Sequence, residues 1–136
     1  MVESRYADFK TIKEVWNEYK LEDGTIVKLR FILIKLINQP NGFGIGSTII
    51  IGIFPSPDLI GLPSQAIYSP QELEKSIEKK DLQFELVKED WNVYELKDKS
   101  KLSIKPILVS ISRTNKHDQH GEPIYAIQPQ QIIKKI

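Results

Sequence analysis

The sequence predicts a mainly β protein with a minor α component. We expect two tandem, pseudo-symmetric, small antiparallel β units that are barrel- or sandwich-like and are linked by one short helix. Three observations lead to this fold class: a segment that recurs at a constant spacing, apolar and polar residues that alternate in both copies, and one strong helix-start signal between the copies. We assign residues 1–68 to the first β repeat, 69–81 to the linker helix and 82–136 to the second β repeat. A unit of about 60 residues has a marginal core, so we expect the halves to pack as one domain.

The recurring segment covers residues 16–37 and 91–112, which align without gaps at an offset of 75 and share seven identities in 22 positions. The identical pairs are Trp16/Trp91, Asn17/Asn92, Tyr19/Tyr94, Leu21/Leu96, Asp23/Asp98, Ile32/Ile107 and Leu33/Leu108. The offset also holds upstream, where Phe9 aligns with Phe84 and Ile12 with Val87. Two aligned tryptophans rarely arise by chance, so we interpret the match as an internal repeat.

Each copy begins with two predicted strands. Residues 82–88 alternate with period two, which indicates a strand. The alignment then favours a strand at 7–13, although the first copy by itself has near-helical spacing. The second strands are predicted at 16–22 and 91–97. Asp23-Gly24 is a hairpin turn signal because glycine readily takes positive φ, whereas Asp98-Lys99 predicts a longer or different loop.

A long third strand and a fourth strand follow, at 25–37 and 47–54 in the first copy and at 101–112 and 122–128 in the second. The third strand of the first copy alternates at its start but is apolar at every position from Phe31 to Ile34. This change predicts a strand that passes from a half-buried to a fully buried environment. Pro106 aligns with Phe31 and cannot donate a ladder hydrogen bond, so we expect a bend or bulge there.

The linker contains the one strong helix signal. Ser69-Pro70-Gln71-Glu72 has the order of a capping box, with serine at the N-cap, proline at the first helical position and glutamate at the third. Leu73 and Ile77 lie at the spacing of one narrow apolar stripe, and the predicted helix ends near Asp81.

Residues 38–69 contain a single charged residue, Asp58, in 32 positions. Their most apolar part, Ile49 to Phe54, would promote aggregation as an exposed sheet edge. We therefore expect it to be covered: as a central strand, by a homo-oligomer contact through this strand or through the following 59–63 loop, or as the wall of a ligand groove. The preceding glycines are Gly42, Gly44 and Gly46. No helix start follows them, so they indicate a flexible loop and not a phosphate-binding turn.

Few residues offer catalytic chemistry. The chain has no cysteine, which excludes disulfides, thiolate catalysis and cysteine-ligated metal centres. His117, Asp118 and His120 are weak metal-ligand candidates, and a solvated loop explains the same segment. We assign no catalytic residue and expect no cofactor.

Charge is balanced overall, at +1, but it is unevenly distributed. The balance disfavours a surface that is basic throughout. Residues 70–100 have a net charge of −3 and residues 101–136 a net charge of +4. The weak binding candidates are aromatic and basic: Trp16, Tyr19, Arg30, Trp91, Tyr94 and Lys105. If these residues were exposed, they would form a platform for single-stranded nucleic acid. If the aromatic residues were buried, they would be ordinary core residues. We interpret Asn17 and Asn92 as turn or backbone-capping residues.

Our leading functional hypothesis is a non-catalytic protein–protein interaction or structural module, with a homodimer that hides Ile49 to Phe54 as one version. The alternatives are a single-stranded nucleic-acid-binding small β-barrel and, least favoured, a metal-dependent enzyme. The 21 isoleucines and the excess of lysine over arginine, sixteen to three, are typical either of a thermophile or of an AT-rich genome. Met1 precedes a polar segment and the longest apolar stretch, 48–54, is too short to span a bilayer, so we expect a cytoplasmic protein with no membrane partner.

Overall fold

The computed structural model describes residues 5–135, except for the side chain of Lys135. Residues 1–4 and 136, the outer limits of the two predicted repeats, lie outside it. The elements in chain order are β1 (Tyr6–Ala7), β2 (Phe9–Lys13), β3 (Asn17–Leu21), β4 (Ile26–Gln39), β5 (Gly42–Phe54), a 3₁₀ turn η1 (Pro57–Leu59), α1 (Pro70–Lys75), β6 (Ile77–Lys79), β7 (Phe84–Lys88), β8 (Asn92–Leu96), β9 (Lys101–His117) and β10 (Pro123–Lys135).

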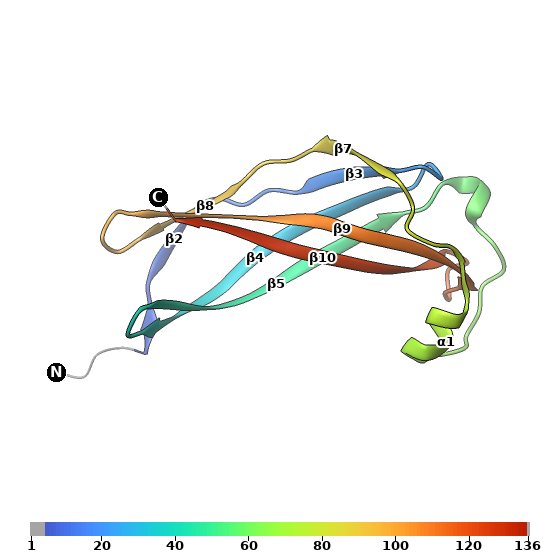
Figure 1. Cartoon of the computed structure of the whole chain (residues 1–136), viewed down its shortest axis with the longest axis horizontal. Helices are drawn as coiled ribbons and strands as arrows, with labels where there is room; N and C mark the ends of the chain where they lie inside the picture. Colours follow the sequence, from blue (N-terminus) through green and yellow to red (C-terminus); the bar gives the residue numbers. More distant parts are fainter. Residues whose placement is uncertain (1–4, 136) are drawn as a thin grey trace.

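Within the described residues, the strands form two antiparallel five-stranded sheets (Figure 1). In the first sheet, β4 pairs with β5 on one side and with β3 and β1 on the other, and β7 lies beyond β3. In the second sheet, β9 pairs with β10 on one side and with β8 and β6 on the other, and β2 lies beyond β8. The predicted fold class, mainly β with two antiparallel units and a short helix between strands, is confirmed.

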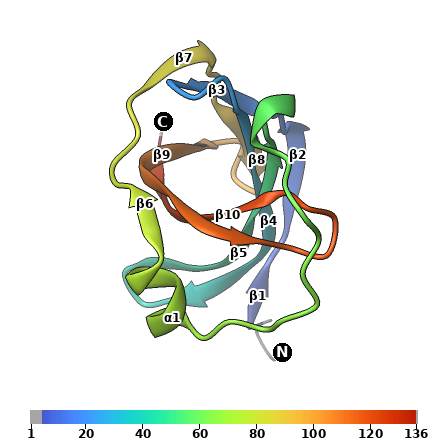
Figure 2. The same ribbon diagram turned by 90° about the vertical axis from the view of Figure 1, so that its right-hand side faces the viewer.

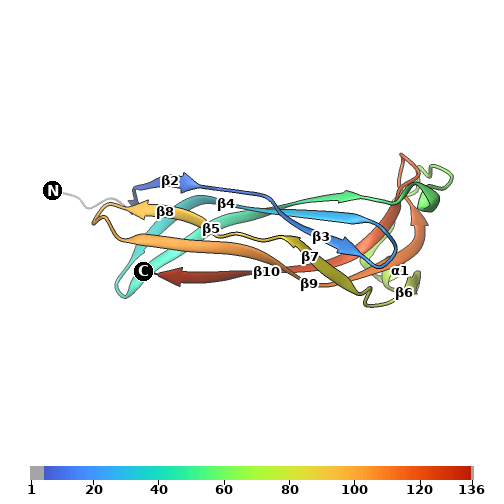
Figure 3. The ribbon, with the colours of Figure 1, turned by 90° about the horizontal axis from the view of Figure 1, so that it is seen from above.

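The outermost strands are exchanged between the two halves of the chain. β2 precedes β3 in sequence but pairs with β8, so that Phe9 lies opposite Leu96. In the same way β7 precedes β8 but pairs with β3, and Phe84 lies opposite Leu21. β7 runs beside β3 and β2 beside β8 in both Figure 1 and Figure 3. Each sheet is therefore completed by a strand from the other half, and a chain cut between residues 68 and 82 would remove one strand from each sheet.

The core lies between the two sheets and consists of two equivalent clusters along the long axis. The first joins Tyr19, Leu21, Val27 and Leu29 of the first sheet to Leu108 and Ile111 of the second. The second joins Tyr94, Leu96, Leu102 and Ile104 to Leu33 and Leu36, which are the same positions shifted by 75 residues. β4 and β9 thus each begin in one cluster and end in the other. Viewed along this axis, the sheets curve around their shared interior (Figure 2).

Two expectations about the long strands were wrong. In β4, alternation continues past Phe31: Phe31 and Leu33 are buried, whereas Ile34 is 58% exposed. The register shifts between Leu33 and Lys35, so Ile34 is the bulged residue. In β9 the shift comes at the equivalent Val109, between Leu108 and Ser110. The apolar run reflects a bulge that turns one residue outward, and the bulge lies three residues after Pro106, not at it.

The second hairpin does not need a different loop. The Leu21 amide donates to the Thr25 carbonyl at 2.8 Å, and the Leu96 amide donates to the Ser100 carbonyl at 2.8 Å. Both turns have a residue at positive φ, Gly24 at 89° and Lys99 at 73°. Lys99 therefore adopts the left-handed conformation that glycine occupies in the first copy.

The linker helix is shorter than predicted. Its capping box is confirmed, because the Ser69 side chain accepts from the Glu72 amide and the Glu72 side chain accepts from the Ser69 amide. The helix ends at Lys75, with Ser76 as its C-cap, and not near Asp81. Ile77 begins β6 because the chain here pairs with β9, which a helix would prevent.

The glycine-rich segment is also a strand and not a flexible loop. β5 begins at Gly42, and Gly44 and Gly46 lie within its ladder opposite Ile37 and Lys35. Gly42, with a φ of 137°, directly follows the turn at Pro40 and Asn41. β5 pairs with β4 and with no other described strand, so the prediction of a central strand for Ile49 to Phe54 was wrong: it is a sheet edge.

Candidate functional site

Asn17 and Asn92 connect the two sheets and are fully buried. The Asn17 side chain donates to the Pro106 carbonyl at 3.2 Å and accepts from the Asp90 amide at 3.0 Å. The Asn92 side chain donates to the Phe31 carbonyl at 2.8 Å and accepts from the Val15 amide at 2.9 Å. The two sets of partners are related by the same shift of 75 residues: each asparagine donates to a strand of the opposite sheet and accepts from the loop that precedes the other asparagine.

A second reciprocal contact involves Glu14 and Glu89. The Tyr94 hydroxyl donates to Glu14 at 2.8 Å, and the Tyr19 hydroxyl donates to Glu89 at 3.4 Å. Burial and then the adjacent Glu14 carboxylate raise the pKa of Tyr94, and burial together with Glu89 raises the pKa of Tyr19. These tyrosines are 0% and 4% exposed, so they belong to the core and offer no surface for stacking.

The two tryptophans are half-buried at the surface, each beside a cation. The Arg30 guanidinium lies 5.8 Å from the Trp16 ring centre and forms an ion pair with Glu14 at 3.6 Å. The Lys105 ammonium lies 4.6 Å from the Trp91 ring centre and forms an ion pair with Glu89. The Lys134 ammonium also lies 5.7 Å from the Trp91 ring centre. The candidate residues thus divide into surface pairs, Trp16 with Arg30 and Trp91 with Lys105, and the buried Tyr19 and Tyr94.

Glu14 and Glu89 were not predicted from the sequence, although Glu14 binds Tyr94 and Arg30. Glu89 binds Tyr19 and Lys105 in the same way. The signal was present, because these glutamates align at the offset of 75, as do Lys13 and Lys88. They lie just upstream of the aligned segment, and glutamate is so common on solvated strands that a matching pair does not by itself indicate a site. Asn17 and Asn92 were predicted to bind backbone groups; they do so between sheets and not within a turn.

Another polar cluster is centred on Asp23. Its carboxylate accepts from the Arg113 guanidinium and from the Tyr125 hydroxyl, each at 2.9 Å. Burial would raise the pKa of Asp23, but hydrogen bonds from Thr25, Tyr125 and Arg113 outweigh it and lower the pKa. Burial, together with the Asp23 charge, raises the pKa of Tyr125 to about 12. This cluster fastens the first hairpin turn to β9 and β10.

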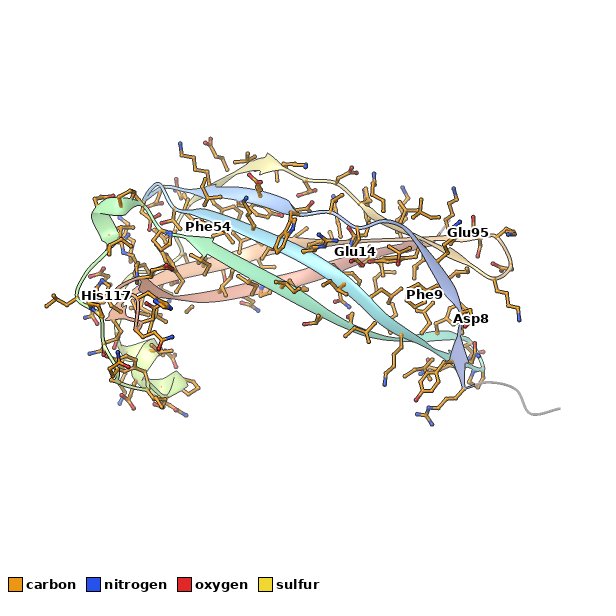
Figure 4. The ribbon with its side chains drawn as sticks, turned by 180° about the vertical axis from the view of Figure 1, so that it is seen from behind. Asp8, Phe9, Glu14, Phe54, Glu95 and His117 are labelled. Atoms are coloured by element: carbon orange, nitrogen blue, oxygen red, sulfur yellow. The ribbon has the colours of Figure 1, made fainter. Side chains whose placement is uncertain are left out.

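The histidine segment lies at the end of the molecule near α1, where Figure 4 labels His117. Asp118 accepts from the amides of His120 and Glu122, which makes it a turn residue of the β9–β10 hairpin. The His117 ring packs directly on Gly61, where an added Cβ would lie 2.7 Å from Nε2. His120 is exposed. Among residues 5–135, no three His, Asp or Glu side chains gather in a way that could hold a metal ion.

The sheet edges differ sharply in how they are protected. β1, β2, β6 and β7 have five residues or fewer. β10 is long, but it contains Pro123 and Pro129, its ladder with β9 has two register shifts, and its end is lysine-rich. β5 is equally long and contains neither proline nor any charged residue. Charges, prolines, bulges and shortness are the devices that prevent edges from pairing with other chains, and β5 has none of these except the bulge of its partner at Ile34.

The apolar side chains of β5 are partly exposed. Ile49 and Ile53 pack against the core, whereas Ile50 is 42%, Ile51 37% and Phe54 54% exposed.

No helix within residues 5–135 has both the length and the apolar character needed to cross a bilayer. No protein-family model, curated protein or solved structure matches this chain.

Proposed function

We propose that this chain is a non-catalytic interaction module that self-associates as a homodimer through the β5 edge. The observation that carries the proposal is that β5 is the long edge that lacks charge and proline, while β10 has both. Pairing two copies of β5 in antiparallel orientation would join two first sheets into one continuous sheet. A second copy is the partner that fits best, because an antiparallel edge is self-complementary about a two-fold axis.

Side-chain chemistry supports the same choice. The partly exposed isoleucines of β5 would face their counterparts in the second copy, and β-branched residues pack well across paired strands. β5 itself carries no carboxylate or cation that would need a partner of opposite charge. A charged peptide or nucleic-acid strand would therefore gain little from β5 beyond its backbone hydrogen bonds.

The test compares two matched substitutions by analytical ultracentrifugation over a wide range of protein concentration. Ile51 lies opposite Leu29 on β4, and Ile133 lies opposite the equivalent Ile104 on β9. Their exposures are also similar, at 37% and 47%. An inward-pointing lysine is a natural device against edge pairing, so Ile51→Lys should produce a monomer. Ile133→Lys makes the same change on β10 and should leave the dimer intact.

Circular dichroism establishes that both variants are folded, and the flexible lysine stem should reach solvent in each. Amide exchange supplies a second readout: in the wild type, amides throughout residues 45–53 should be protected, and half of them should lose protection in Ile51→Lys. A wild-type protein that is monomeric at every concentration would overturn the proposal. Equal dissociation by both lysine variants would also contradict it, because the contact would then not be specific to β5.

A further inference from the structure

The outward face of the first sheet contains a cavity of about 460 Å³. Its walls include Trp16, Phe54 and Gly52, and its polar groups include Lys28, Arg30 and Lys88. Glu14 and Phe54, which also line it, are labelled in Figure 4. The volume falls within the range of small-molecule sites, about 300–1,000 Å³. The cavity is separate from the outer edge of β5, although Gly52 and Phe54 belong to that strand.

Comparison with the second sheet shows why the cavity exists. Gly52 pairs with Lys28 on β4, and Lys134 pairs with the equivalent Ser103 on β9. Lys134 covers the Trp91 ring from 5.7 Å, in addition to Lys105. Gly52 has no side chain to cover Trp16 in this way. The part of Trp16 that corresponds to the covered part of Trp91 therefore borders open space.

Gly52 has a second effect, on Phe54. A Cβ at position 52 would lie 3.2 Å from the Phe54 ring, so glycine allows that ring to lie across the strand. Phe54 remains 54% exposed, and the Lys28 ammonium is 5.1 Å from its ring centre. The cavity therefore has two aromatic walls with exposed surface, and aromatic rings prefer offset-stacked or edge-to-face contacts with other rings.

Within residues 5–135, one of the cations that line the cavity forms no ion pair. Lys28 pairs with Glu18 at 3.5 Å and Arg30 with Glu14 at 3.6 Å. Beside Trp91, the position equivalent to Lys88 is occupied by Lys13, whose ammonium forms an ion pair with Asp90 at 2.9 Å. The residue that corresponds to Asp90 in the first set is Val15, which lines the cavity. Among the described residues, no carboxylate pairs with Lys88, and its charge acts on Asp90 only at longer range.

We propose that this cavity binds a small planar aromatic molecule that carries one anionic group. The ligand's ring packs against Trp16 and Phe54, and its anion interacts with Lys88. The Arg30 guanidinium, 5.8 Å from the Trp16 ring centre, is a second nearby positive charge. A carboxylate and a phosphate share this chemistry. The inference does not depend on β5 pairing, because Trp16 and Lys88 are not in β5.

The experiment follows the two ¹⁵N-labelled indole signals by NMR, each identified by its loss in Trp16→Phe or Trp91→Phe. The probes are benzoate and adenosine 5′-monophosphate, with benzyl alcohol and adenosine as their uncharged counterparts and inorganic phosphate as a bare anion. We expect a saturable shift of the Trp16 signal with at least one anionic aromatic probe, and no saturable shift of the Trp91 signal. The probe that binds distinguishes a carboxylate from a phosphate.

Matched lysine variants test the anion contact. Lys88→Ala should weaken binding of the anionic probe about fivefold, the effect of an exposed ion pair of about 1 kcal/mol. Lys13→Ala, which changes the equivalent residue beside Trp91, should leave the affinity unchanged. The proposal is overturned if no probe shifts Trp16 saturably, if both tryptophans respond alike, or if inorganic phosphate binds as tightly as the aromatic anions.

Discussion

The buried asparagines should be among the most sensitive positions in the molecule. Replacing Asn17 by alanine would leave the Pro106 carbonyl and the Asp90 amide without the partners they have at 3.2 and 3.0 Å. A buried polar group without a partner costs about 1–3 kcal/mol. Pro106 is fully buried, whereas Asp90 is half-buried and water can reach it. We expect Asn17→Ala to lower the free energy of unfolding by about 2–4 kcal/mol, including the loss of packed side-chain atoms.

Asn92→Ala should have a somewhat larger effect, because its side chain also donates to the Tyr94 hydroxyl at 3.2 Å. Urea denaturation followed by circular dichroism measures both changes, and the exposed Asn115→Ala serves as the control with an effect within about 0.5 kcal/mol. If Asn17→Ala were no more destabilising than Asn115→Ala, the asparagines would not hold the sheets together, and the reciprocal-contact reasoning would be refuted.

Three further predictions concern the turns and titrating groups. Lys99→Gly should raise the free energy of unfolding by up to about 1 kcal/mol, because Lys99 has a φ of 73°, and Lys97→Gly should give no gain in the same denaturation assay. The folded-state pKa of Tyr125 is raised to about 12, so Tyr125 contributes stability below pH 10 that is lost as pH rises from 10 to 12. Tyr125→Phe should therefore flatten the decline of the unfolding free energy in this alkaline range. An unchanged decline would contradict the assignment. The folded-state pKa of Asp23 is lowered, so its contribution is present above its ordinary pKa of about 3.9 and is lost as pH falls through the lower, folded-state pKa; Asp23→Asn should therefore cost stability at neutral pH and progressively less in acid, when unfolding is measured at several pH values.

Local signals in the sequence were sufficient wherever a structure depends on adjacent residues. The alternation in 82–88 predicted β7 and, through the alignment, β2. The Ser69 capping box was confirmed because its hydrogen bonds join residues three apart. Local patterns failed where pairing with a distant strand decided the outcome: Ile77 joins β9 instead of continuing the helix, and Ile34 turns outward at a bulge set by the register with β5.

The candidate site shows the same division. Trp16, Arg30, Trp91 and Lys105 were found because they repeat, and the structure places each tryptophan beside its cation. Exposure of a side chain could not be inferred from its repetition, so the tyrosines, which are equally well repeated, were grouped with them although they are buried. The surroundings of the two tryptophans differ because Gly52 lies near Trp16 where Lys134 lies near Trp91. Both residues lie outside the aligned segments 16–37 and 91–112, and their equivalence is visible only through the strand pairing.

The sequence by itself determined that the chain is a mainly β protein and predicted an internal repeat, because period-two alternation and a 75-residue offset are properties of the chain read in order. Only the tertiary structure decided that β2 and β7 change places between the sheets and that β5 is an edge. Strand pairing is made by backbone groups that every residue carries, so a local pattern indicates a strand without specifying its neighbour. The neighbour is selected by buried contacts between distant segments, and the reciprocal hydrogen bonds of Asn17 and Asn92 are contacts of this kind.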